Sequence, residues 1–379
     1  MIRTKCRLKT LMPCHIGSGD ILLNNQDFIV DGYQIGIIEP RKIFNIVGEQ
    51  GIDLWCRAIN NNKNIYTHLH RINDRIRLKD FCRRTMPVYG ETSNVAELRE
   101  QLRSGKAACI PGSSLKGAIV TALMSSKTYD ADKLLDNIRP ANNRIVDRVF
   151  SSAPQYDPKN SELRFLRVGD ACFDQVPTCA FHCVSLNIRS GRSPLLDEKV
   201  HQLVECIYAE DPVEFTIDLP DSQSRYFRDI TVCGPQIPHA LTSPRALLRC
   251  INDHTKSLLE EELDFWQDYD NIELDNYLPQ IKKMMDECNA CTDGRSAVMR
   301  VGYGCGWNFI TGAWSCRCTE NDDPDKWQDI LELARKDRKG RYDEYPFIKT
   351  RRIFYDGPKE PIMPFGFVKI ELQDRTKRK

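Results

Sequence analysis

Short apolar stretches of strand character alternate along the chain with longer stretches in which apolar residues recur at helical spacing. Strand character is clearest at 7–13, 28–30, 33–38, 107–110, 160–173, 179–186, 214–219, 298–306 and 368–372. Helical spacing predicts helices at 41–47, 54–60, 95–103, 195–207, 244–263, 278–288 and 327–336, and a strand–turn–helix unit spans 107–126. Short strands that alternate with helices and include hairpins predict an α+β fold rather than a doubly wound parallel sheet.

Two parts of this pattern indicate how the chain is organised. Residues Phe28–Ile38 hold two apolar runs around Asp31-Gly32, which is typical of a β-hairpin. Residues 40–105 are mostly helical in pattern and are expected to form an inserted helical block before the strand at 107–110. The sequence holds no repeat of fixed period, although glycine-rich loops in both halves suggest a duplicated unit.

Length and composition limit the classes of protein to consider. A chain of 379 residues suits two or three domains, each with its own core. It has no long apolar stretch, and the basic residues at its start precede no apolar segment, so we expect neither export nor membrane attachment. The 16 cysteines are scattered singly along predicted strands and helices, which is typical of a protein in a reducing cytoplasm.

Charge is distributed unevenly although the net charge is only +1. Basic residues cluster at 71–84 and 375–379, whereas acidic residues concentrate at 260–287. This asymmetry predicts a subunit with both nucleic-acid and protein neighbours. The block at 40–105 and the acidic helix near 260–268 are the parts that we expect to face protein.

The segment Ile110–Thr121 carries the clearest local chemistry of the chain. An apolar strand end leads through Pro111-Gly112 into two serines, Lys116 and an apolar helix start. Such a junction offers backbone N–H groups and a helix dipole to an anion, with the serines as candidate N-caps. The lysine precedes the second glycine, so the spacing is not that of a nucleotide-binding Walker A loop. An ordinary capped strand–turn–helix stays open as the alternative.

Three glycine-containing loops of one chemical type each follow a predicted strand. They are His15–Asp20, Pro111–Gly117 and Gly302–Trp307. The third also brings Arg300 and Tyr303 close to exposed backbone. Aromatic and guanidinium planes that stack on bases, with N–H groups and lysines on phosphates, are typical of single-stranded RNA binding. Hairpin turns and a helix cap are the structural alternatives for these loops.

The three loops, in this order, resemble the RAMP superfamily of CRISPR interference subunits. The sequence Ile-Pro-Gly-Ser-Ser-Leu-Lys-Gly at 110–117 is a specific signature of that superfamily. Within it, the chain resembles the type III-A Csm subunit that caps the 3′-side end of the guide RNA. The hairpin at 28–38, the long block before Ile110 and the segment Pro364–Ile370 carry this second resemblance. Phe367 stands where the family often has Trp.

The resemblance implies two ferredoxin-like (RRM-like) domains side by side. The first would span 1–190 with the helical insertion at 40–105, and the second 191–379 with the glycine loop at 302–307. It also implies contact with crRNA (the guide) and target RNA, and assembly with the other Csm subunits, above all the repeated backbone RAMP subunit. A part in guide maturation through recruited host nucleases and in antiviral interference follows, and no cofactor is implied.

The RNA contacts that we expect lie in the three loops, with Arg300 added because its cation stands beside the third loop. These residues are His15, Gly17, Ser18, Gly19, Ser113, Ser114, Lys116, Gly117, Arg300, Gly302, Gly304, Gly306 and Trp307. Affinity would come mainly from phosphate neutralisation, so the guide sequence would be read weakly.

A catalytic role is the main alternative. Related backbone subunits cut target RNA with an acidic residue in the loop after the first glycine segment, and Asp20, Asp27 and Asp31 lie in that region. Turns explain such aspartates equally well, and no acid–base pair is recognisable, so we expect no catalytic residue. An endoribonuclease that uses one of these aspartates stays open.

Four cysteines are the candidate metal ligands. Cys288 and Cys291 have the spacing of one half of a zinc site, but Cys316 and Cys318 are separated by a single residue, which is poor geometry for zinc. We expect no metal, and zinc stays open as an alternative.

Overall fold

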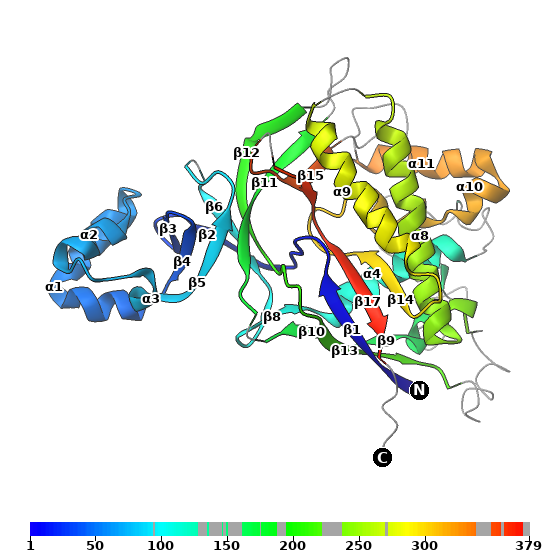
Figure 1. Cartoon of the computed structure of the whole chain (residues 1–379), viewed down its shortest axis with the longest axis horizontal. Coiled ribbons are helices and arrows are strands. Elements are labelled where there is room, and N and C mark those ends of the chain that lie inside the picture. The colour runs from blue at the N-terminus through cyan, green and yellow to red at the C-terminus, as the bar shows by residue number, and fades with distance from the viewer. Residues whose placement is uncertain are drawn as a thin grey trace.

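The computed structural model describes residues 1–93, 95–127, 135, 146, 149–150, 161–174, 176–187, 195–221, 237–269, 272–338, 350–357 and 360–373. It confirms the α+β class, with curved sheets flanked by helices (Figure 1). In these parts of the chain, no helix is long and apolar enough to cross a membrane. The basic segment at 375–379 lies outside the described residues.

A five-stranded sheet joins the two halves of the chain. Its order is β14 (Ser296–Arg300), β17 (Phe367–Leu372), β1 (Ile2–Thr10), β13 (Val213–Leu219) and β9 (Arg167–Val168), and all neighbours are antiparallel. The alternating apolar residues of β1 that face the core, Cys6 and Leu8, are fully buried. The central place of β1 means that the N-terminal strand is held by strands from the second half of the chain.

Helices cover this sheet and complete its core. They are α4 (Gly112–Ser126), α8 (Pro244–Trp266) and α9 (Ile272–Asn289), and α8 contacts both other helices as well as β14. The N-cap of α8 is Ser243, whose hydroxyl accepts the Ala246 N–H at 3.1 Å, with Pro244 in the first turn as the sequence predicts. Shorter elements complete this side of the molecule: η2 (Glu162–Phe165), η3 (His239–Leu241), η4 (Trp307–Phe309), η5 (Ala313–Ser315), α10 (Cys318–Asp322) and α11 (Pro324–Arg338).

A larger sheet runs beside the first. Its main path is β2 (Gly17–Leu23), β6 (Glu97–Gln101), β12 (Leu195–Cys206), β11 (Cys179–Asn187), β5 (Cys82–Tyr89), β4 (Gln34–Ile38) and β3 (Phe28–Asp31). β15 (Thr350–Phe354) pairs with β11 and with β16 (Met363–Pro364). A three-stranded sheet of β10 (Ala171–Phe173), β8 (Ala107–Ile110) and β7 (Arg103–Ser104) leads into α4. The predicted hairpin at 28–38 is therefore confirmed as β3 and β4.

The predicted helical block at 40–105 is only partly helical. Helices α1 (Pro40–Asn60), α2 (Ile65–Ile72) and α3 (Leu78–Phe81) form a lobe at one end of the molecule around a small core of their own (Figure 1). The predicted helices at 41–47 and 54–60 are the two arms of α1, which is kinked at Gly48. Residues 82–105 carry β5, β6 and β7 instead of helix.

Two predicted helices are wrong for the same physical reason. Residues 95–103 contain β6, which lies between β2 and β12, and residues 195–207 contain β12, which pairs with β6 and β11. The apolar residues of these two segments do not alternate strictly with polar ones, so they show no clear period of two and also fit helical spacing. Long-range pairing, which no local pattern records, decides for strand.

The predicted domain boundary between residues 190 and 191 lies outside the described residues. The strands on either side of it, β11 and β12, pair antiparallel from Cys179↔Cys206 to Asn187↔Leu195. The division into domains at this point stays a prediction.

A mostly buried carboxylate fastens α8 to its neighbours. Glu262 on α8 accepts hydrogen bonds from Arg351 Nε at 2.8 Å and Nη2 at 2.7 Å, from Trp266 at 2.9 Å and from Tyr277 at 2.7 Å. These partners lie on β15, α8 and α9. Burial by itself raises the pKa of Glu262, but Arg351 and the hydrogen bonds outweigh it and lower the pKa to about 2.

We expect Glu262→Gln to lower the free energy of unfolding by about 3 kcal/mol, because it leaves the Arg351 charge buried without its partner. Urea denaturation followed by circular dichroism measures the change, with the exposed Glu49→Gln as control. The wild-type protein should lose this contribution as the pH falls from about 4.5 towards 2, because the unfolded chain takes up the proton first. Equal midpoints for the two variants would contradict this role for Glu262.

Candidate nucleic-acid interface

The three glycine loops, far apart in the sequence, meet around one open cavity of about 430 Å³. The first loop precedes β2 and continues into its first residues, the second opens α4 and the third follows β14. The cavity is lined by His15, Ile16, Gly17, Arg99, Ser114, Gly117, Ala118, Thr121, Arg300, Val301, Gly302, Tyr303, Cys305, Phe309, Ile310 and Thr311. We call this cavity the loop cleft.

Backbone contact joins the first and third loops. The Tyr303 N–H donates to the His15 carbonyl at 2.9 Å. Gly302 has a φ of 89°, and a Cβ at this position would lie 2.3 Å from the same carbonyl oxygen. Only glycine permits both the left-handed backbone and this close approach.

In the signature segment, Ile110–Gly117, most polar groups form hydrogen bonds within the protein. Gly112 donates its N–H to the carboxylate of Asp170 at 2.7 Å, and a Cβ there would lie 2.1 Å from the Val168 carbonyl oxygen. The Lys116 ammonium donates to the carbonyls of Leu163 at 2.9 Å and Leu166 at 2.8 Å. The anion at this helix N-terminus is therefore a carboxylate of the chain itself.

This arrangement corrects the expected helix cap and gives Lys116 partners within the protein. The N-cap of α4 is Pro111, without a side-chain hydrogen bond, so neither Ser113 nor Ser114 caps the helix. Lys116 does not line the loop cleft, and burial, followed by the nearby Arg167 charge, lowers its pKa. Its ammonium stabilises the 163–166 segment, and its contact with a phosphate stays a prediction.

Three further predicted residues belong to the packing beneath the loops. His15 is buried, with Nδ1 2.7 Å from the Glu205 carbonyl oxygen, and burial is the main cause that lowers its pKa. The buried guanidinium of Arg300 donates to the carbonyls of Phe365 at 2.9 Å and Gly304 at 3.1 Å. Trp307 stacks on Trp314 with ring centroids 4.3 Å apart. These contacts hold the loops in place, and RNA contact by the three residues stays a prediction.

The remaining predicted residues are small and lie at or near the surface. Gly17, Gly19, Ser113, Gly117 and Gly302 are exposed, and Ser18, Ser114, Gly304 and Gly306 are half-buried. Of these, Gly17, Ser114, Gly117 and Gly302 line the loop cleft, while Gly306 lines a smaller cavity beside Glu262. RNA contact by these residues stays a prediction.

A family model described as the RAMP superfamily matches residues 7–272 of the chain. The chain belongs to the RAMP superfamily. No curated protein matches its sequence.

Two solved structures share the fold of this RAMP chain. One is a chain of a cryo-EM structure of a Csm-crRNA-target RNA ternary complex of a type III-A CRISPR-Cas system, with a TM-score of 0.66 and 17% identity over 98% of this chain and 100% of that one. The other is the crystal structure of T. onnurineus Csm5, with a TM-score of 0.62 and 17% identity over 96% and 99% of the two chains. This agreement supports the α+β architecture and is consistent with the paired ferredoxin-like units.

The loop cleft contains a cation that the sequence pattern did not indicate. Arg99 on β6 donates Nε–H to Gln202 Oε1 at 2.7 Å, and its guanidinium lies 5.4 Å from the centroid of the Tyr303 ring. Gln202 in turn donates to the Tyr303 hydroxyl. No motif surrounds Arg99, and its segment resembled a helix, so only strand pairing places it beside the third loop.

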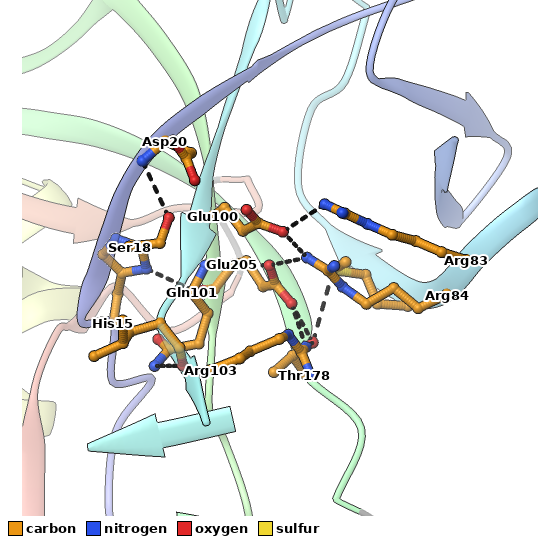
Figure 2. A network of polar contacts seen from close by, with 12 residues as sticks. His15, Ser18, Asp20, Arg83, Arg84, Glu100, Gln101, Arg103, Thr178 and Glu205 are labelled. Carbon is orange, nitrogen blue, oxygen red and sulfur yellow. Dashed lines mark hydrogen bonds and ion pairs between the residues drawn. The ribbon is translucent and has the colours of Figure 1, made fainter. Parts of the chain in front are cut away.

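A fully buried carboxylate supports the loops from behind (Figure 2). One oxygen of Glu205 accepts hydrogen bonds from Arg103 and Thr178, both at 2.6 Å, and the other from Arg84 at 2.8 Å and the Gln101 N–H at 3.2 Å. Burial by itself raises the pKa of Glu205, but the two arginines and Thr178 outweigh it, so the net shift is downward. The group stays ionised and joins β5, β6, β7 and β12.

The buried side chain of Gln101 links this network to two of the loops. Its Oε1 accepts the Ile16 N–H at 3.0 Å, and its Nε2 donates to the Cys109 carbonyl at 3.0 Å. Ile16 belongs to the first loop, and Cys109 lies just before the signature segment. The Glu205 network therefore fixes the spacing between the first and second loops.

The candidate catalytic aspartates are separate from the cleft lining. Asp27 accepts the Leu23 N–H at 2.9 Å, and Asp31 ends β3 at the hairpin turn, so both have structural roles. Asp20 is exposed in β2, and its N–H donates to the Ser18 hydroxyl at 3.1 Å.

The candidate zinc cysteines pack in different places. Cys288 and Cys291 belong to the core cluster around α9, and Cys316 belongs to the core that includes α4. Within the described ranges, no three His, Cys, Asp or Glu side chains are grouped as a metal site would need.

We expect Lys116→Met to lower the free energy of unfolding by about 2 kcal/mol, because two charged hydrogen bonds to backbone carbonyls are lost. The exposed Lys106→Met is the matched control. Thermal or urea denaturation measures both variants. If Lys116→Met instead keeps wild-type stability and loses only RNA affinity, the internal role assigned to this ammonium is wrong.

Proposed function

We propose that this RAMP chain is a non-catalytic, RNA-binding structural subunit of a type III-A Csm effector complex. Its place would be at the 3′-side end of the crRNA, which it would cap. The observation that carries the proposal is the meeting of the three glycine loops at one cleft. Family membership and the fold shared with Csm5 support it.

The chemistry of the loop cleft suits an RNA backbone rather than particular bases. Exposed backbone at Gly17, Gly117 and Gly302 permits close approach of a sugar-phosphate chain. Arg99 supplies a positive charge, and the exposed Ile310 supplies an apolar contact beside it. Contacts of this kind position a strand without reading its sequence, so guides of any sequence would be accepted.

The partners of the chain follow from the same proposal. The resemblance to the capping subunit predicts crRNA, target RNA and the repeated backbone RAMP subunit as neighbours, with host nucleases recruited during guide maturation. The lobe of α1–α3 and the acidic helix α8 are the surfaces proposed to face protein.

We expect Arg99→Gln to weaken binding of a labelled single-stranded RNA about tenfold, similarly for unrelated sequences. The slope of log affinity against log salt should also fall by about one unit, because one phosphate contact is lost. Gly117→Leu, whose side chain would extend into open space at the cleft, should weaken binding as well. Fluorescence anisotropy measures both, with Arg7→Gln on the exposed face of β1 as control. Unchanged affinity in both cleft variants would remove the cleft from the RNA site.

The same labelled single-stranded RNA also tests whether the chain cleaves RNA. With Mg²⁺ present, a denaturing gel should show the RNA intact after incubation with the purified chain. Cleavage that disappears in Asp20→Ala would overturn the non-catalytic role while leaving the RNA-binding site in place.

Co-expression with the other Csm subunits and a guide array tests the capping position. We expect complexes formed without this chain to carry guides with altered 3′-side ends, because nothing covers that end. Sequencing of the purified guides measures their ends, and Arg7→Gln again serves as control. A full complex with normally trimmed guides in the absence of the chain would contradict the capping role.

A further inference from the structure

Two half-exposed tyrosines lie on the larger sheet and are not part of the loop cleft lining. Tyr89 ends β5 and Tyr208 follows β12, and each residue is 43% exposed. Both rings rest on Phe181 of β11, which is only 2% exposed. Tyr89 stacks on Phe181 with centroids 5.2 Å apart, and Tyr208 meets it edge-on at 5.9 Å. We call Tyr89, Phe181 and Tyr208 the tyrosine patch.

The rings of the tyrosine patch are held in position before any partner binds. Phe181 also meets Phe354 of β15 at 5.0 Å, so the patch rests on a buried aromatic layer that spans neighbouring strands. Ring faces that are already ordered lose little conformational entropy on binding, which favours tyrosine at interfaces.

Carboxylates lie near the patch or next to its residues in the sequence. Glu210 lies close enough to Tyr208 to contribute, after burial, to the raised pKa of its hydroxyl. Gly90, next to Tyr89, lies against the Tyr355 carbonyl, which brings the exposed Asp356 to this edge. The pKa of Asp356 is itself raised, first by burial and then by Glu360. The acidic rim comprises Glu91, Glu210, Asp211, Asp356 and Glu360, all exposed.

Charge decides which class of partner fits the patch. Tyrosine faces would stack equally well on an RNA base or on a guanidinium. A carboxylate rim repels a phosphate backbone and attracts a cation. The chemistry is therefore the opposite of that in the loop cleft, where Arg99 stands beside Tyr303.

We propose that the tyrosine patch and its acidic rim bind an arginine-bearing segment of a partner protein. Guanidinium groups would stack on Tyr89 and Tyr208 while the rim carboxylates accept their hydrogen bonds. The site is independent of the RNA-binding role, because it shares no residue with the loop cleft lining.

Titration of the full-length chain into a fluorescein-labelled peptide of alternating glycine and arginine tests this proposal. We expect wild-type protein to bind it more tightly than the matching glycine–lysine peptide, because arginine stacks on tyrosine rings better than lysine does. A glycine–serine peptide should not bind. Tyr89→Ser and Tyr208→Ser should each weaken arginine-peptide binding about two- to fivefold. Tyr89→Phe keeps the ring and should retain binding. Glu210→Gln combined with Asp356→Asn should weaken binding and reduce its dependence on salt.

Matched controls separate the site from general effects of charge and surface change. Tyr33→Ser alters a tyrosine that is 88% exposed and lies outside the patch. Glu49→Gln removes an exposed carboxylate of the α1–α3 lobe. Both variants should bind the peptide as tightly as wild type. Equal losses in Tyr33→Ser and Tyr89→Ser, or no arginine-peptide binding by wild type, would overturn the proposal. If the tyrosine variants lose binding of a short oligouridylate but keep binding of the peptide, the patch is an RNA-binding surface. That result would also overturn the proposal. None of these results depends on the Arg99 assay, so the two proposals fail separately.

Discussion

The architecture of the loop cleft depends on one buried charge. Glu205 has no exposed side-chain surface and is held by two arginines, a threonine and a backbone N–H. Its own carbonyl contacts the His15 ring, and its neighbour Gln101 holds Ile16 and Cys109. Removing one partner of such a cluster leaves the others charged in a medium that solvates them poorly, which costs several kcal/mol. Strands from four parts of the chain must therefore assemble around Glu205, and in doing so they fix the distance between the first two glycine loops.

The signature segment shows how one motif can have an internal and an external part. Its lysine, its first glycine and its helix N-terminus all serve the neighbouring 163–170 segment, where Asp170 supplies the anion that the helix dipole attracts. This leaves Ser114 and Gly117 at the cleft, where small size and open backbone are what they contribute. A sequence motif that resembles a phosphate cradle thus builds the wall of a cleft, and the charge at that wall comes from Arg99 on another sheet strand.

The loop cleft and the tyrosine patch differ in their chemistry. A guanidinium and exposed backbone face the loop cleft, whereas tyrosine rings and nearby carboxylates lie on β5, β11 and the segment after β12 of the same sheet. Under the two proposals, the chain would hold a polyanion at the loop cleft and a cationic protein segment at the tyrosine patch. The interior of the larger sheet connects the two surfaces, because Tyr303 packs against the hydrophobic cluster that contains Phe181.

The sequence by itself determined the α+β class, most strands and helices, the hairpin at 28–38 and the three loops, because each has a local signal in turn residues or periodicity. It did not determine β6 and β12, whose helical spacing was overridden by pairing with strands on both sides. Tertiary structure also decided what the loop residues do. Lys116, Arg300 and Trp307 look like ligands of RNA in the sequence, yet their contacts lie within the protein, since burial and hydrogen-bond partners are set by segments far along the chain. Arg99 and the tyrosine patch had no local signal at all, because only the sheet brings their members together.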